Sequence, residues 1–152
     1  MTGVRVDRDR PGAADPVTAT AAVPGVARGA AVVCWAYAAG FGLPALPIAA
    51  YALRERELPW LGDLFPMYGG PWWGPLSPEA FAATLVGYAG VTAAVAWGGW
   101  LMWRGRRSGA VLAVAMIPIE AVFWYGYALP IPPALALLRV GLIAAAWPRL
   151  RR

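Results

Sequence analysis

Apolar residues gather in four long stretches along the chain, and polar or proline-rich segments separate them. The stretches cover residues 29–53, 78–103, 109–129 and 132–148. A helix needs about 20 apolar residues to cross the hydrocarbon core of a membrane. Prolines in "LPIPP" at 129–133 interrupt the last apolar run, so we count two helices there rather than one. The pattern predicts an all-α integral membrane protein, folded as a bundle of four transmembrane helices.

Composition supports a membrane protein. The chain has 152 residues, of which 60% are hydrophobic and 14% are charged, and its mean hydropathy is +0.54. Soluble domains usually carry about 25% charged residues. The chain contains no His and no Lys, which excludes a Ser-His-Asp triad, an imidazole metal site and a P-loop. The single Cys34 cannot form an internal disulfide. We therefore expect no catalytic residues, no metal and no cofactor, and the protein is not expected to be an enzyme.

The arginines predict the orientation in the membrane. Arg54 and Arg56 lie between the first two stretches, each beside a Glu. Ten arginines fall on the opposite side of the predicted membrane: Arg5, Arg8, Arg10, Arg28, Arg104, Arg106, Arg107, Arg149, Arg151 and Arg152. Basic residues accumulate on the cytoplasmic side of membrane proteins. Both termini are therefore predicted to be cytoplasmic in a multi-pass protein of the cell membrane. The net charge of +5 then reports topology rather than nucleic-acid binding.

The two ends of the chain are predicted to lie outside the membrane domain. Residues 1–28 mix charges with Pro, Gly, Ala and Thr and offer no continuous apolar face, which is typical of a disordered cytoplasmic tail. Residues 149–152 form a short basic cytoplasmic tail. The membrane domain between them covers residues 29–148.

A long segment rich in aromatic residues, 54–77, lies between the first two stretches and is predicted to be extracytoplasmic. Leu58, Leu61, Leu64 and Phe65 recur at spacings of three and four residues, and Pro59 stands at the start of the segment. This pattern predicts a short amphipathic helix on the membrane surface.

The rest of this segment, "MYGGPWWGPL", predicts sharp turns. Gly69 and Gly70 permit positive φ. Trp72 and Trp73 are amphipathic side chains that anchor proteins at membrane interfaces. We interpret the segment as an interfacial cap; a lid over an outward-facing cavity and a surface for a partner are the alternatives.

Two charged residues, Glu120 and Arg139, lie inside the predicted helices. A charge in the membrane costs roughly 2.5–3.5 kcal/mol on insertion scales, so such side chains usually face the protein interior and have a partner. Counting about 1.5 Å per residue from the turn near Pro130 places the two at depths that differ by roughly 3 Å. The sequence therefore predicts a buried ion pair between them, in which Arg can donate two hydrogen bonds to one carboxylate.

The neighbours of Glu120 suggest a ligand cavity. Aromatic rings beside a carboxylate could bind an organic cation, and the carboxylate could also take up and release a proton. Prolines in "GFGLPALP" at 40–47 break the first helix, and broken helices line binding sites in some transporters. The candidate lining residues are Phe123, Trp124, Tyr127, Pro44, Pro47, Trp72 and Trp73.

Small residues repeat along the second stretch at Gly90, Ala94 and Gly98. This spacing lets two helices approach closely. The contact could lie within the bundle or could form a homodimer.

Two functional hypotheses remain from the sequence. The first is a non-catalytic structural or accessory membrane module, whose partners are the lipid bilayer and either a second copy or another membrane protein. The alternative is a small transporter or binder of a cationic or lipid-like molecule, which uses Glu120 in an aromatic-lined cavity. The second needs an open cavity at Glu120, whereas the first needs the same side chains packed solidly. Neither involves nucleic acid.

Overall fold

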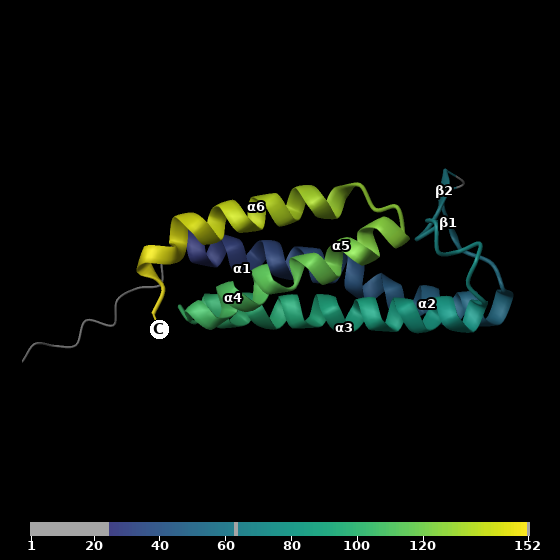
Figure 1. The fold of residues 1–152 in the computed structure, drawn as a ribbon, viewed down its shortest axis with the longest axis horizontal. Helices are drawn as coiled ribbons and strands as arrows, with labels where there is room; N and C mark the ends of the chain where they lie inside the picture. The colour runs from purple at the N-terminus through teal and green to yellow at the C-terminus, as the bar shows by residue number, and fades with distance from the viewer. Residues whose placement is uncertain (1–24, 63, 152) are drawn as a thin grey trace, which may run out of the picture.

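The computed structural model describes residues 25–62 and 64–151 and is mostly helical (Figure 1). Four helices are long and apolar enough to cross a membrane, as the sequence predicts: Gly25–Glu55, Pro78–Trp103, Arg107–Gly126 and Ile131–Arg149. We refer to these as the first to fourth spans. The first span begins earlier than predicted, at Gly25 rather than at residue 29. The rest of the predicted N-terminal tail, residues 1–24, lies outside the described residues.

The spans run side by side, and the described ends of the chain lie at the same end of the bundle (Figure 1). The first span packs along α3, α4 packs on α3, and α6 packs on α1, while α5 leads away from α3 toward α6 (Figure 1). The elements are α1 (Gly25–Tyr37), the π-helix η1 (Ala38–Gly42), α2 (Leu43–Glu55), β1 (Trp60–Leu61), β2 (Phe65–Pro66), α3 (Pro78–Trp103), α4 (Arg107–Ala115), α5 (Ile117–Gly126), α6 (Ile131–Ala146) and the 3₁₀ turn η2 (Trp147–Arg149).

The first span changes its hydrogen-bond register at the predicted proline break. Pro44 has no backbone N–H to donate to the preceding turn. The N–H of Leu43 bonds to the carbonyl of Ala38, five residues earlier, so that η1 is a π-helix. Such segments are rare and often lie at functional or strained positions.

Residues 60–66 form a two-stranded antiparallel hairpin, so the predicted amphipathic helix is wrong. Trp60 pairs with Pro66, and Leu61 pairs with Phe65. Gly62 adopts a positive φ of 56° in the turn, which ends any helical path. Prolines at 59 and 66 also leave too few residues between them to nucleate a helix. The hairpin exposes four large apolar side chains: Trp60, Leu61, Leu64 and Phe65.

The third span consists of two helices, because Pro118 interrupts its ladder between α4 and α5. Its end differs from the prediction, since α5 stops at Gly126 rather than at residue 129. Ala128 has a φ of 51°, the N–H of Leu129 bonds to the carbonyl of Trp124, and the N–H of Ala128 bonds to that of Tyr125. These two bonds are those of a Schellman motif, which ends the helix.

Glycines set the approach of α3 to α4. A Cβ atom added to Gly109 would lie 2.4 Å from the carbonyl oxygen of Gly98, and one added to Gly98 would lie 3.0 Å from the carbonyl oxygen of Gly109. The predicted small-residue stripe therefore packs within the chain at Gly98. It does not do so at Gly90, which is exposed with no atom within 4 Å of an added Cβ, and Ala94 between them is partly buried.

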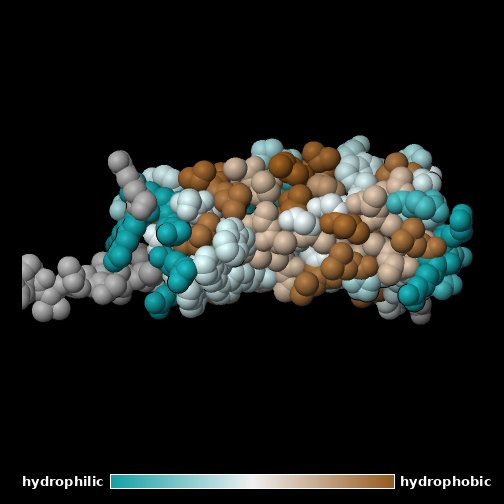
Figure 2. Space-filling model, turned by 90° about the horizontal axis from the view of Figure 1, so that it is seen from below, coloured by the Kyte–Doolittle hydropathy of each residue, from teal (hydrophilic) through white to brown (hydrophobic). Residues whose placement is uncertain are grey.

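The surface matches a bundle with two polar ends. Figure 2 shows hydrophilic side chains at both ends of the molecule and an apolar band between them. At the end that holds the described termini, the backbone N–H of Arg107 bonds to the carbonyl of Arg151 at 2.9 Å, and the N–H of Arg151 bonds to that of Gly105 at 2.8 Å. These bonds fasten the C-terminus to the turn between α3 and α4.

A methyl group at the α3–α4 crossing should separate the two helices. We expect Gly109→Ala to lower the free energy of unfolding in detergent by about 1–3 kcal/mol, since neither backbone can yield without a shift. The matched control is Gly90→Ala, which adds the same methyl group to a helix at an open position. This control should leave stability unchanged or raise it by up to about 1 kcal/mol. Equal effects of the two changes would show that the crossing is not tightly packed.

Candidate functional site

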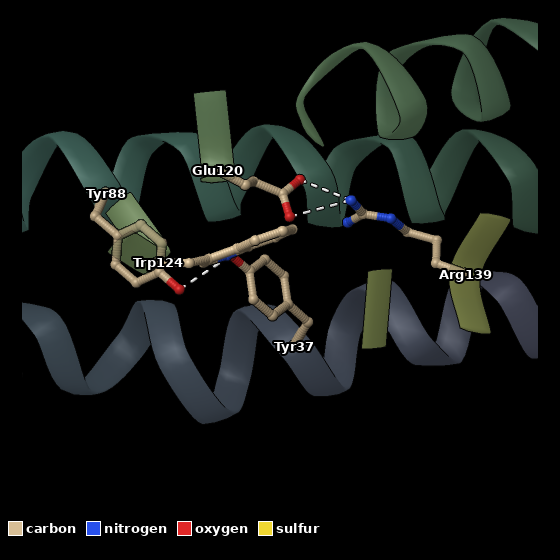
Figure 3. A network of polar contacts seen from close by, with 5 residues as sticks. All are labelled: Tyr37, Tyr88, Glu120, Trp124 and Arg139. Atoms are coloured by element: carbon tan, nitrogen blue, oxygen red, sulfur yellow. Dashed lines mark hydrogen bonds and ion pairs between the residues drawn. The ribbon is translucent and has the colours of Figure 1, made fainter. Parts of the chain in front are cut away.

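Glu120 and Arg139, the two charges within the long apolar helices, meet in the predicted ion pair. Nη2 of Arg139 donates to both carboxylate oxygens of Glu120, at 2.8 Å to Oε1 and 3.1 Å to Oε2 (Figure 3). The Glu120 and Arg139 residues are 1% and 2% exposed. The geometry is not the parallel two-nitrogen fork, because one nitrogen serves both oxygens. Nε of Arg139 has no hydrogen-bond partner among the described residues.

The break at Pro118 positions Glu120. The carboxylate belongs to the first turn of α5, which begins at Ile117 directly after the break. The N-terminal end of a helix carries a partial positive charge that favours a carboxylate. Glu120 is therefore held by two sources of positive charge, the start of its own helix and the guanidinium of Arg139.

Tyr37 of α1 flanks the arginine. The guanidinium carbon of Arg139 lies 5.8 Å from the centre of the Tyr37 ring, within the range of a cation–π contact. This contact joins the fourth span to the first, whereas the ion pair joins the fourth span to the third.

Hydrogen bonds extend this contact to the second span. Nε1 of Trp124 donates to the hydroxyl of Tyr37 at 2.9 Å, and that hydroxyl lies 3.0 Å from the hydroxyl of Tyr88 on α3 (Figure 3). Each of the four spans thus contributes at least one polar side chain to one network, which we call the midspan network: Tyr37, Tyr88, Glu120, Trp124 and Arg139.

A dense set of rings covers the midspan network on the side of the hairpin. Tyr127 lies at its centre, and its hydroxyl donates to Oγ1 of Thr84 at 2.9 Å. Its ring centre lies between 5.2 and 6.0 Å from five other ring centres. We call this set the aromatic cluster: Tyr68, Trp72, Phe81, Tyr88, Phe123 and Tyr127. Most of its ring pairs are edge-to-face, which is a favourable arrangement for aromatic side chains.

The loop after the hairpin packs directly onto the end of α5. The Trp72 ring lies against Gly126, where an added Cβ would be 2.3 Å from the ring, and the N–H of Trp72 bonds to the carbonyl of Gly126 at 3.2 Å. A Cβ at Gly70 would lie 2.4 Å from the same carbonyl oxygen. Two glycines therefore allow this close contact, and the neighbouring Trp73 ring lies 5.0 Å from that of Phe81.

The prediction of positive φ at Gly69 and Gly70 is wrong, because Tyr68 adopts that conformation instead, with a φ of 59°. Its hydroxyl donates to the carbonyl oxygen of Phe41 in the π-helix. Tyr68 thus satisfies a backbone acceptor at the break in the first span. Burial, and then the neighbouring Tyr127, raise the pKa of Tyr68, so that its hydroxyl remains a donor at physiological pH.

The aromatic side chains predicted to line a cavity at Glu120 are packed in or against the apolar core. Ring contacts fill the space between Phe123, Trp124, Tyr127 and Trp72, and Trp73 packs on Phe81. Four grooves on the described part of the chain are lined neither by Glu120 nor by any of these five aromatic residues. Pro44 and Pro47 border one of the four, a groove of about 310 Å³ beside Tyr51 and Met67.

The sequence analysis missed three tyrosines of the site, namely Tyr37, Tyr68 and Tyr88. Tyr37 and Tyr88 carry hydroxyl groups within apolar stretches, and a polar group there needs a partner. That signal could have identified them. No comparable signal marks Tyr68, whose partner is a backbone carbonyl.

The chemistry of the site is that of an ion pair within a set of neutral hydrogen bonds. Within residues 25–62 and 64–151, no three His, Cys, Asp or Glu side chains lie close enough to hold a metal ion. The chain matches no protein-family model, no curated protein and no solved structure. The geometry is therefore the basis for any proposal about function.

Removing the ring that covers Gly126 should be costly. We expect Trp72→Ala to lower the free energy of unfolding in detergent by about 3–5 kcal/mol, as large-to-small changes in packed cores do. Trp60→Ala is the matched control, because Trp60 lies on the same loop and is 60% exposed. It should change stability little. If the two changes had similar effects, the loop would not be an integral part of the core.

Proposed function

We propose that this chain is a multi-pass protein of the cell membrane that acts as a non-catalytic structural or accessory module. Both termini are cytoplasmic, and the hairpin and aromatic loop face the other side. The observation that carries the proposal is the closed Glu120–Arg139 pair, 1% and 2% exposed, beneath a packed aromatic cluster. Its partners are the lipid bilayer and a second copy or another membrane protein.

The pair suits a role in specifying the bundle. Buried ion pairs rarely stabilise more than well-packed apolar residues would, but breaking one leaves an uncompensated charge. Any change in register between α5 and α6 would separate Glu120 from Arg139. The midspan network extends the same requirement to Tyr37 and Tyr88, and hence to all four spans.

A transporter that uses Glu120 has less support. Such a protein needs a path along which a cation or proton reaches the carboxylate. Here Arg139 already neutralises it, and Trp124, which is 8% exposed, and the ring of Tyr37 lie beside the pair. Opening a path would require these contacts to separate.

The distribution of charged and aromatic side chains supports the orientation. Arg28, Arg104 and Arg107 all lie at the end that holds the described termini, each with its guanidinium over a tryptophan ring. Arg54 and Arg56 lie at the other end, where Arg56 contacts Glu79 at 3.5 Å. Basic residues accumulate at the cytoplasmic boundary, whereas tryptophans mark both boundaries, so the arginines carry the orientation.

A double-mutant cycle tests the structural role of the pair. We expect Glu120→Gln and Arg139→Met each to lower the free energy of unfolding in detergent by about 3–5 kcal/mol, because each leaves a buried group without its partner. The double variant should lose clearly less than the sum, since no unpaired charge remains. Arg56→Gln, at an exposed pair, is the control and should have no measurable effect.

The opposite pattern would favour the transporter. If Glu120→Gln were neutral or stabilising while Arg139→Met was costly, the carboxylate would be retained for a purpose other than folding. Uptake of an organic cation or of protons by vesicles that contain the protein would then be the decisive measurement.

Cysteine labelling tests the topology. Cys34 is buried, so introduced cysteines can be read against a low background. An impermeant maleimide should label Gly74→Cys in intact cells, because Gly74 is exposed on the aromatic loop. It should label Ser108→Cys, at the exposed start of α4, only after the cells are permeabilised. The reverse result would invert the orientation, and equal labelling of both in intact cells would contradict a membrane-spanning bundle.

A further inference from the structure

A long apolar groove lies between the bent first span and α3. Its volume is about 610 Å³, within the usual range for small-molecule sites. Alanines line much of it, including Ala89, Ala93 and Ala96 on α3, while Trp35, Leu46 and Trp100 border it. The groove opens on the side of the bundle, where the proposed orientation places lipid.

The π-helix explains why the groove exists. At η1 the two spans touch closely, since a Cβ added to Gly42 would lie 2.0 Å from Oγ1 of Thr92. The neighbours of this contact, among them Ala38 and Ala93, are too small to fill the space beside it. The groove therefore follows from the backbone path and from the small side chains along it.

The length of the groove and its position along the bundle match one leaflet of the membrane. Along α3 it extends from Ala89 to Trp100, which is roughly 16 Å at about 1.5 Å per residue. Half of the hydrocarbon core is about 15 Å. Ala89 lies near the middle of α3 and Trp100 near its C-terminal end, so the groove covers the leaflet on the side of the described termini.

Two arginines stand at the Trp100 end of the groove. The guanidinium carbon of Arg104 lies 4.5 Å from the centre of the Trp100 ring. That of Arg28 lies 5.3 Å from the ring of Trp103, which in turn lies 5.3 Å from the ring of Trp35. Both arginines are exposed, and neither takes part in the ion pairs formed by the described residues. Arginine is well suited to bind phosphate.

From this juxtaposition we propose that the groove between the first span and α3 binds one acyl chain of an anionic phospholipid, whose phosphate group is held by Arg28 and Arg104. The proposal rests on the proposed membrane insertion and places the lipid in the cytoplasmic leaflet. The groove recognises this lipid through an apolar channel as long as one acyl chain, with positive charge at the end where the headgroup lies. Zwitterionic lipids with the same chains fill the groove less well, because basic residues favour anionic headgroups.

Native mass spectrometry of the full chain in detergent tests the proposal, with phosphatidylglycerol and phosphatidylcholine of identical acyl chains as probes. We expect one phosphatidylglycerol to bind about tenfold more tightly than phosphatidylcholine. The Arg28→Gln/Arg104→Gln double variant should remove this preference. The matched control is Arg54→Gln/Arg56→Gln, which removes the same charge at the other end and should retain the preference.

A second variant tests the groove itself. Ala93→Trp fills it from an exposed position, and it should weaken phosphatidylglycerol binding about tenfold without loss of thermal stability. Ala83→Trp, at an exposed position of α3 outside the groove, should bind lipid as the parent chain does.

Equal binding of the two lipids, or unchanged binding by Ala93→Trp, would overturn the proposal. A dimer that Ala93→Trp dissociates would also overturn it and would assign the groove to a second copy. This readout does not depend on orientation, so a failure here is distinct from a failure of the topology measured by cysteine labelling.

Discussion

The contact between Glu120 and Arg139 is the constraint on which the bundle depends. Both side chains are almost fully buried, and a separated charge in such a place would cost several kcal/mol. The pair therefore fixes the height of α5 relative to α6. The ring of Tyr37 lies against Arg139, and its hydroxyl bonds with Trp124 and lies within hydrogen-bond distance of Tyr88. A single buried interaction is thus transmitted to the register of all four spans, in a setting where apolar burial alone distinguishes registers poorly.

The packed loop maintains the conditions under which this pair is strong. Trp72 lies on Gly126 and Gly70 lies on the backbone at Gly126 and Tyr127, so the loop covers the end of α5 without a gap for a side chain. The hydroxyl of Tyr68 donates a hydrogen bond to the carbonyl oxygen of Phe41 at the break in the first span. Electrostatic interactions weaken in contact with water, and Glu120 and Arg139 are 1% and 2% exposed beneath the aromatic cluster. The packed loop and the ion pair therefore act together rather than as separate features.

The number of spans and the ion pair could be predicted from the sequence, because hydrophobic length and the cost of a membrane charge act locally. The hairpin formed by β1 and β2 could not be predicted, because its residues also fit the spacing of a helix. The positive φ of 56° at Gly62 distinguishes the hairpin from a helix. The π-helix could not be predicted from the sequence either. Prolines predict that the ladder breaks, but Tyr68, distant in sequence, supplies the donor that makes one particular break acceptable. The packing of the rings near Glu120 was unpredictable for the same reason, because Trp72 reaches Phe123 and Tyr127 from a loop.

The two halves of the bundle are packed in different ways. Toward the hairpin, rings fill the interior and meet at fixed angles around Tyr127. Toward the described termini, the buried residues of α1 and α4 are small, among them Ala27, Ala30, Cys34, Gly109 and Ala110. Small residues bring helices close together but leave the space beside such a contact unfilled, as in the groove beside η1. Where such a space opens onto the side of this half, as in the groove beside η1, an exchangeable molecule has room, whereas rings fill the interior of the aromatic half.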